Sequence, residues 1–288
     1  MPTRYIDLTT DFGFKRIFGR PESKNILKHF LFDMLDLPHP IEDITYIPKE
    51  QIPDWKSERI GIYDVHCTDT SGRRFMVEMQ KHWQKYFRDR TIYYLALSIT
   101  QQAIKGKWDY QLMPVYCVSI ANFHVGEEDV TPTYLHPVQL MNTEQNTVFF
   151  DKLKLVYVEL PYFKKEQHEL TTNIDRWLYT IRHSVKLNKL PESLSTPPFE
   201  ELFKSAEFAN LEEEDQASYL ENIKRERDHY SIMTSNIKKA RKEGHEKGMQ
   251  QGMQQTQIET AHKMLAKGMD ISLIAELTVL SVDEIMKL

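Results

Sequence analysis

The chain has 288 residues, enough for one large domain with an appendage or for two modest domains. Its hydrophobic content of 41% and charged content of 27% exclude an intrinsically disordered chain, and its formal charge of −5 arises after residue 195. We expect a cytoplasmic protein with no secretory signal and no membrane span, because the N-terminus lacks a cationic segment before an apolar one and no apolar run approaches about eighteen residues.

Short strands and helices are predicted over residues 1–195. In chain order these are a helix at 22–36, strands at 44–48, 59–69 and 73–80, a helix at 86–105, an apolar strand at 113–123, a polar loop, a strand at 153–160 and a helix around 168–186. The helix at 86–105 should bury one stripe, formed by Ile92, Leu95, Ala96, Ile99 and Ala103. This pattern predicts an α/β, or mixed α+β, domain.

The rest of the chain is predicted to be helical. Residues 196–257 form a charged segment in which Gly244, Gly248 and Gly252 recur every four residues. This spacing favours a helical connector that is flexible or lets copies of the chain self-associate, although a plain linker has the same pattern. Residues 258–288 form a small helical module.

Three turn signals divide that module. Gly268 is a natural helix end, Asp270 can cap a second helix, and Ser281 with Glu284 forms a capping box for a third. Short helices with tight turns also suggest a helix-turn-helix. However, three lysines against five acids in residues 258–288 favour a protein-interaction or packing unit over DNA binding.

Two acids, Asp64 and Glu78, lie in the neighbouring strands predicted at 59–69 and 73–80. Residues 70–72 fit a three-residue hairpin loop that ends in glycine, which makes Asp69 and Arg73 the flanking pair. Antiparallel pairing then places Asp64 directly opposite Glu78, with Gln80 further along the same face. Opposed carboxylates destabilise a sheet unless they share a proton or bind a cation such as Mg²⁺. The alternative is a pair of acids at solvated strand positions.

Basic residues gather around Glu78. Residues 73–107 hold eight lysines and arginines against two acids, which suits a polyanionic substrate, although a solvated helix face has the same composition. Arg88 and Arg90, at the start of the helix, are candidate contacts to DNA phosphates. Aromatic residues are interleaved with these charges, which suits nucleic acid but equally suits a folded turn: His82, Trp83, Tyr86 and Phe87.

Asp64 and the run Glu78-Met79-Gln80 resemble the metal-binding core of the PD-(D/E)XK nuclease superfamily. The segments TDFGFKRIFG (10–19) and LMPVYCVSIANF (112–123), the helix at 90–106 and the glycine-spaced tail resemble the recombination-promoting nuclease and transposase family. The resemblance covers about the first 200 residues. It implies a restriction-endonuclease-like sheet flanked by helices, with a helical C-terminal extension.

By this resemblance, Asp64, Glu78 and the backbone carbonyl of Met79 would bind Mg²⁺, with Mn²⁺ as an alternative ion. Gln80 takes the place that lysine usually holds, and it can orient a water molecule but cannot deprotonate it. Tyr63 stands where the superfamily often has a proline. Lys15 is a further catalytic candidate that could reach over the site. In the alternative interpretation Lys15 is simply exposed, on a loop whose aromatic residues fill the core.

The resemblance implies a metal-dependent DNA endonuclease that hydrolyses phosphodiester bonds in double-stranded DNA and is linked to recombination or mobile elements. The alternative is a catalytically inactive, nuclease-like scaffold that binds DNA or protein. In both cases the C-terminal helices could join copies of the chain into a homo-oligomer.

Overall fold

The computed structural model describes residues 3–47, 63–103, 109–125 and 132–288. The predicted strand residues 59–62 and helix residues 104–105 lie outside these ranges. The chain divides into two compact units, Met1–Ile223 and Lys224–Leu288. In the described ranges, no helix combines the length and the apolar character that crossing a membrane requires.

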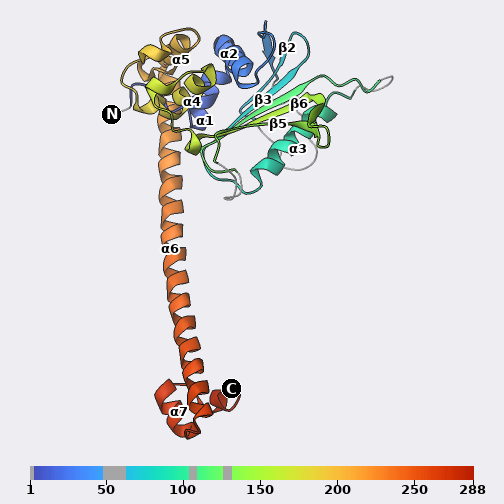
Figure 1. Ribbon diagram of the computed structural model, residues 1–288. Coiled ribbons are helices and arrows are strands. Elements are labelled where there is room, and N and C mark those ends of the chain that lie inside the picture. The colour runs from blue at the N-terminus through green and yellow to red at the C-terminus, as the bar shows by residue number, and fades with distance from the viewer. Residues whose placement is uncertain (1–2, 48–62, 104–108, 126–131) are drawn as a thin grey trace. The chain divides into compact units, whose positions relative to one another are not determined.

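A six-stranded mixed sheet forms the centre of the first unit (Figure 1). Its strands are β1 (Ile44–Tyr46), β2 (Val65–Asp69), β3 (Arg74–Gln80), β4 (Val115–Ala121), β5 (Leu135–Asn142) and β6 (Thr147–Glu159). Their spatial order is β1-β2-β3-β4-β6-β5, in which β3, β4 and β6 run parallel and the other neighbours antiparallel. The predicted strands at 73–80, 113–123 and 153–160 are therefore confirmed. The strand predicted at 44–48 is confirmed at 44–46, and its residue 48 lies outside the described ranges.

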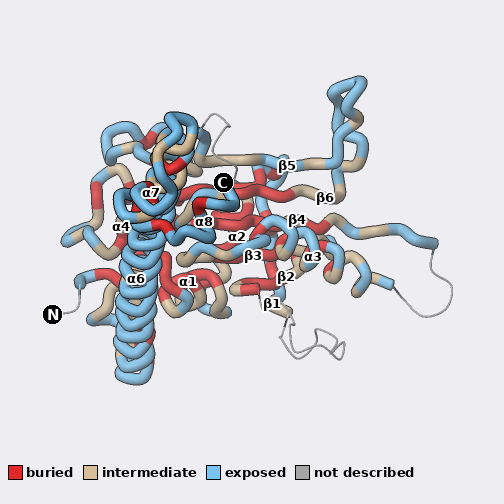
Figure 2. Tube along the Cα trace, turned by 90° about the horizontal axis from the view of Figure 1, so that it is seen from below, coloured by how far each residue is buried: buried red, intermediate tan, exposed pale blue. Residues whose placement is uncertain are grey.

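Helices cover both faces of this sheet (Figure 1). One face packs against α1 (Asp11–Phe18), α2 (Lys24–Met34), α4 (Asn173–His183) and α5 (Phe199–Ala206), and the other against α3 (Phe87–Thr100). Figure 2 shows buried residues along the central strands β3, β4 and β6. A mixed sheet between helical layers is the restriction-endonuclease-like arrangement that the resemblance implies, so the predicted fold class is confirmed.

Alternation along β3 assigns its side chains to the two faces. Phe75, Val77 and Met79 belong to the core beneath α1 and α2, whereas Met76 belongs to the core beneath α3. Because successive side chains of a strand point to opposite faces, Glu78 lies on the α3 face, as does Met76.

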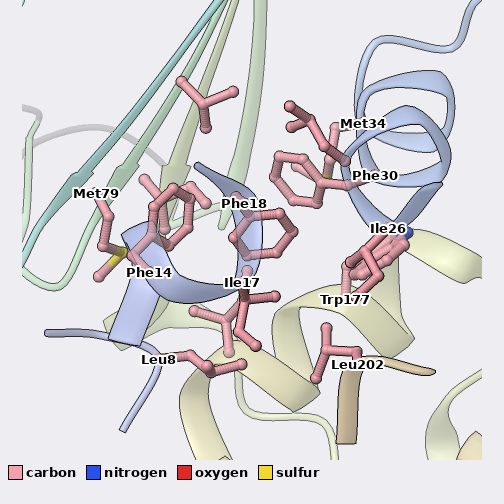
Figure 3. Packing of buried hydrophobic residues seen from close by; sticks show 14 of the residues in the cluster. Leu8, Phe14, Ile17, Phe18, Ile26, Phe30, Met34, Met79, Trp177 and Leu202 are labelled. Carbon is pink, nitrogen blue, oxygen red and sulfur yellow. The ribbon is translucent and has the colours of Figure 1, made fainter. Parts of the chain in front are cut away.

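The segment around Phe14 forms the helix α1, where the sequence analysis expects a loop. Thr10 caps this helix by accepting a hydrogen bond from the backbone N–H of Gly13. A Cβ atom at Gly13 would lie 2.1 Å from the carbonyl oxygen of Asp7, so only glycine allows this close approach. Phe14 and Phe18 are fully buried, as expected of core-filling residues, and Figure 3 shows Phe14 beside Met79. Contact between α1 and β3 thus places α1 next to the end of β3.

The buried stripe of α3 differs from the predicted one. Phe87, Thr91, Leu95 and Ser98 are buried, whereas Ile92 is 57% exposed. Phe87 and Leu95 pack on the sheet, and the hydroxyl of Thr91 is accommodated because it donates a hydrogen bond to the carbonyl of Phe87. The predicted stripe is therefore right at Leu95 and Ile99, which pack against the sheet, and wrong at Ile92 and Ala96. Hydrophobicity alone ranks Ile92 above Thr91.

The segment before residue 147 contains a strand, β5, where the sequence analysis expects a polar loop. β5 lies at the edge of the sheet, pairs with β6 and leaves Val138 and Leu140 exposed. It also contains Pro137, which an edge strand tolerates because one side of its backbone needs no hydrogen-bond partner. Without a buried face, β5 lacks the alternation from which strands are predicted.

The helical character predicted for the region after residue 195 is confirmed. α5 contributes Phe199 and Leu202 to the core of the first unit. α6 (Glu213–Ala266) is a single long helix that includes Gly244, Gly248 and Gly252.

In the second unit, the end of α6 packs with α7 (Ile271–Thr278) and α8 (Val282–Ile285) around a small core of Ala261, Ile274, Leu280 and Ile285. The predicted turn signals are confirmed. Gly268 has a φ of +73°, the Asp270 side chain accepts from the N–H of Ser272, and Ser281 forms a capping box with Glu284.

Asp175, which is buried at the start of α4, generates a test of this fold. Burial alone would raise its pKa, but hydrogen bonds from Lys165 and from Thr172 outweigh burial and hold the pKa at about 2. The folded state thus binds the proton more weakly than the unfolded chain does. The stabilisation by Asp175 is therefore present above its ordinary pKa and is lost as pH falls toward 2.

We expect Asp175→Asn to lower the free energy of unfolding by about 2 kcal/mol at pH 7, because the amide cannot accept from both Lys165 and the backbone N–H groups. Urea unfolding measured at pH 7 and near pH 2.5 checks this. The variant and the wild type should converge at the lower pH, and an equal difference at both values would contradict the assignment.

Candidate active site

The hairpin of β2 and β3 has the register that the sequence predicts. Val65 pairs with Val77 and Thr68 with Arg74, and the N–H of Asp69 donates to the carbonyl of Arg73 at 3.0 Å. Gly72 ends the loop with a φ of +83°, as a three-residue hairpin requires.

Asp64 directly precedes β2, and Glu78 directly follows Val77 in β3. Continuing the observed register by one residue therefore sets Asp64 opposite Glu78. The two carboxyl groups influence each other, because the charge of Asp64 raises the pKa of Glu78. The predicted opposition of Asp64 and Glu78 across the hairpin is thus confirmed, while the catalytic role of the pair stays a prediction.

Glu78 is buried and only half satisfied. Its Oε1 accepts a hydrogen bond from Nη2 of Arg90 at 2.7 Å, whereas its Oε2 has no hydrogen-bond partner among the described residues. Burial and then the negative charge of Asp64 raise the pKa of Glu78 to about 8, against the opposing charges of Arg90 and Lys15. A buried carboxylate oxygen without a donor is costly, so this position favours a further positive charge or a proton.

Asp64 is held from a different direction. Its Oδ2 accepts from the backbone N–H of Met79 at 2.7 Å, and its Oδ1 lies 3.3 Å from Nζ of Lys15. Burial raises the pKa of Asp64, while the N–H of Met79 and the charge of Lys15 act against that rise. Because the N–H and C=O of a strand residue point to the same side, the carbonyl of Met79 also points from β3 toward the side of β2.

Lys15 comes from α1 and reaches the carboxylate of Asp64, so the interpretation of Lys15 as simply exposed is wrong. Burial lowers its pKa, but hydrogen bonding to Asp11 and the charge of Asp64 outweigh burial, and the net pKa is raised. Lys15 therefore stays protonated at neutral pH. It can stabilise negative charge but cannot accept a proton.

Gln80 and Arg90 complete the arrangement on the α3 face. Oε1 of Gln80 accepts from Nη2 of Arg90 at 3.0 Å, and Nε2 of Gln80 donates to the carbonyl of His82 at 3.2 Å. Arg90 is predicted from the sequence to contact DNA phosphates. In the structure its guanidinium instead donates hydrogen bonds to Glu78 and Gln80. The missed signal is the short connection between β3 and α3, which folds the first turn of α3 back over the end of β3. Arg88 lies exposed on that same turn.

Lys81 follows Gln80 but points away from the pair, as alternation along the strand predicts. Its Nζ lies 3.0 Å from Oδ2 of Asp7.

The donor set fits a hard divalent cation better than zinc. No group of three or more His, Cys, Asp or Glu side chains that could hold a metal occurs within the described ranges, so a closed site of the zinc type is absent from them. Two carboxylates and one carbonyl, with Oε2 of Glu78 unpartnered, match the demand of Mg²⁺, which takes one or two carboxylates and fills its other positions with water and phosphate oxygens.

Comparisons with known proteins match almost the whole chain. The family described as PD-(D/E)XK nuclease family transposase matches residues 8–236. The family described as Rpn/YhgA-like nuclease family, C-terminal HTH domain, matches residues 254–288. No curated protein and no solved structure matched. The second match favours the DNA-binding alternative for residues 258–288 over the packing unit that the sequence analysis prefers.

Binding of a divalent ion can be tested without any activity assay. We expect excess Mg²⁺ to raise the free energy of unfolding of the wild type by about 1–3 kcal/mol, because the ion binds the folded state alone. Asp64→Asn and Glu78→Gln keep the shape of each side chain but remove its charge, so this gain should vanish in both. Thermal unfolding with Mg²⁺ and with a chelator measures it.

The matched control is Glu200→Gln, which removes an exposed carboxylate from α5 and should keep the full gain. A Mg²⁺ effect of equal size in Asp64→Asn would show that the ion binds elsewhere.

Proposed function

The chain belongs to the PD-(D/E)XK nuclease family of transposases, and from this we propose that it is a metal-dependent endonuclease that hydrolyses phosphodiester bonds in double-stranded DNA. The observation that carries the proposal is the buried pair of Asp64 and Glu78, held between Lys15 and Arg90. A carboxylate pair of this kind is a ready site for a cation, and cationic side chains beside it suit an anionic substrate.

Each residue has a role that follows from its contacts. Asp64, Glu78 and the carbonyl of Met79 would hold Mg²⁺, or Mn²⁺ in its place. The ion, when bound, would supply a Lewis acid that polarises the phosphate and lowers the pKa of a water molecule. Oε1 of Gln80 has a second lone pair beyond its bond to Arg90, with which it can orient the attacking water.

Charge stabilisation is the proposed role of Lys15. Because its pKa is raised, Lys15 remains an ammonium and can offset negative charge that develops on the phosphate. Neither Gln80 nor Lys15 can take the proton of the attacking water, so that proton leaves to solvent or to another base. Arg90 positions Glu78 and Gln80 through hydrogen bonds and balances the negative charge of Glu78.

We propose three segments with different tasks. Residues 1–195 carry the nuclease site, with Arg88 as a phosphate contact. Residues 196–257 form a helical connector through which copies of the chain could associate. Residues 258–288 bind DNA as a helix-turn-helix, a role that the family match supports. Recombination or mobile-element activity is the proposed setting, in line with the description of the matched family as transposases.

A plasmid-nicking assay tests the activity. We expect the wild type to convert supercoiled plasmid to nicked or linear DNA with Mg²⁺ and to leave it intact with a chelator. Asp64→Asn and Glu78→Gln should each lower the rate by a factor of about 10² or more, because each removes a ligand of the ion. Glu200→Gln is the control. Cleavage that survives both site substitutions would contradict the site, and no cleavage with any divalent ion would favour the scaffold alternative.

The role of Lys15 can be separated from that of a base. We expect Lys15→Gln to lower the nicking rate by a factor of about 10² and Lys15→Arg to restore most of it, because arginine keeps the charge but cannot lose its proton near neutral pH. Lys204→Gln, at an exposed position of α5, is the charge-matched control. An inactive Lys15→Arg with unchanged folding would show that Lys15 transfers a proton.

A further inference from the structure

Two large aromatic side chains stand exposed in the connection between β3 and α3. Trp83 is 59% exposed and Tyr86 is 66% exposed, whereas the adjoining Phe87 is buried. Of these three aromatics, only Phe87 fits the interpretation of the segment as a folded turn. Neither Trp83 nor Tyr86 belongs to a hydrophobic core cluster of the described residues.

Hydrogen bonds join this connection to side chains of the candidate active site. The side chain of Gln80 donates to the carbonyl of His82, and Nη1 of Arg90 donates to Oε1 of Gln84. Arg90 is also the hydrogen-bond partner of Glu78. Trp83 therefore lies in the chain between two residues that are each hydrogen-bonded to a side chain of the site, Gln80 or Arg90, which keeps its backbone close to the site.

The backbone holds Tyr86 in an unusual conformation. Tyr86 has φ 60° and ψ 34°, which is the left-handed region that bulky residues rarely adopt. Its carbonyl accepts the N–H of Arg90 and so starts α3. Strain of this kind persists where the surrounding structure imposes it, and it is concentrated at functional sites. Tyr86 combines this conformation at the start of α3 with a ring that is exposed to solvent.

Positive charge surrounds these rings. Nζ of Lys85 lies 4.8 Å from the centre of the Tyr86 ring, and Arg88 is exposed on the following turn. Residues 81–93 contain four lysines and arginines and one acid, Asp89. Lys81 pairs with Asp7 and Arg90 with Glu78, so Lys85 and Arg88 supply the charge of this surface. A surface that combines cations with exposed aromatic rings complements a strand that carries both phosphates and flat bases. A protein partner that binds through apolar contacts alone would leave the charges of Lys85 and Arg88 without partners.

We propose that Trp83 and Tyr86 stack on unpaired bases next to the phosphate that is cut, so that the protein binds locally opened duplex DNA in preference to fully paired DNA. In a closed duplex the faces of the bases are covered by their neighbours, and only unstacked bases offer a face to an aromatic side chain. This inference rests on the proposed nuclease function, whose substrate it narrows to duplex DNA with opened base pairs.

Binding to two matched DNA molecules tests the proposal. All variants carry Asp64→Asn, so that no DNA is cut. One labelled duplex is fully paired, and the other has the same length and charge but a central unpaired tract. Fluorescence anisotropy gives both dissociation constants. We expect the double variant Trp83→Ala/Tyr86→Ala to weaken binding to the opened duplex by at least about fivefold per lost stacking contact, with little change for the paired duplex.

Two control variants separate stacking at this position from a general effect of aromatic side chains on the surface. Trp83→Phe/Tyr86→Phe keeps the aromatic faces and should keep the preference for opened DNA. Phe149→Ala removes an aromatic residue of β6 that is 78% exposed and should change neither constant. Equal weakening on both DNA molecules would overturn the proposal in favour of a general backbone contact. Unchanged dissociation constants for both DNA molecules would also overturn the proposal. The aromatic pair would then be a candidate surface for a protein partner.

The outcome is separable from that of the plasmid assay. If the wild type cuts plasmid but the double variant keeps the preference for opened DNA, the stacking proposal fails and the nuclease function stands. If the wild type never cuts DNA but the preference depends on Trp83 and Tyr86, stacking holds for a DNA-binding scaffold.

Discussion

Two buried carboxylates of like charge, Asp64 and Glu78, set the main constraint on this structure. In a low-dielectric interior such a pair needs positive charge close by. The fold draws that charge from both sides of the sheet, with Lys15 from α1 on Asp64 and Arg90 from α3 on Glu78. The pair thereby ties both helical layers to one hairpin, at the place where β3 ends. The proposed binding of a cation and a phosphate rests on this same buried pair.

Local rules were sufficient to predict the hairpin and the C-terminal turns. The loop that ends in Gly72 defined the pairing of β2 with β3, and the caps at Asp270 and Ser281 defined two short helices. Elements that form because of tertiary packing were not predicted from the sequence. The helix α1 looks like a loop because Gly13 weakens its helix propensity, and only the tertiary contacts of the buried Phe14 reveal why it forms.

The site itself was predicted in part, for a related physical reason. Asp64, Glu78 and Gln80 share one hairpin, so alternation and register are sufficient to bring them together. Lys15 and Arg90 come from other elements, and no local rule states where α1 or α3 will lie. Their arrival also changes the chemistry, since the raised pKa of Lys15 keeps it protonated next to Asp64. In the proposed mechanism, charge and orientation therefore take the place of a side-chain proton acceptor.

The glycines of α6 have a consequence for how the chain comes apart. Apart from the neighbouring residues and the backbone of the helix itself, no described atom lies within 4 Å of where a Cβ would be at Gly244, Gly248 or Gly252, so no packing compensates for the missing side chains. Each glycine weakens a helix by about 1 kcal/mol relative to alanine, and three of them fall within nine residues. On warming, backbone amides there should exchange with solvent sooner than those of the flanking turns. This stretch of α6 should therefore unwind before its flanking turns do. A protease that needs an unwound backbone would cleave there first.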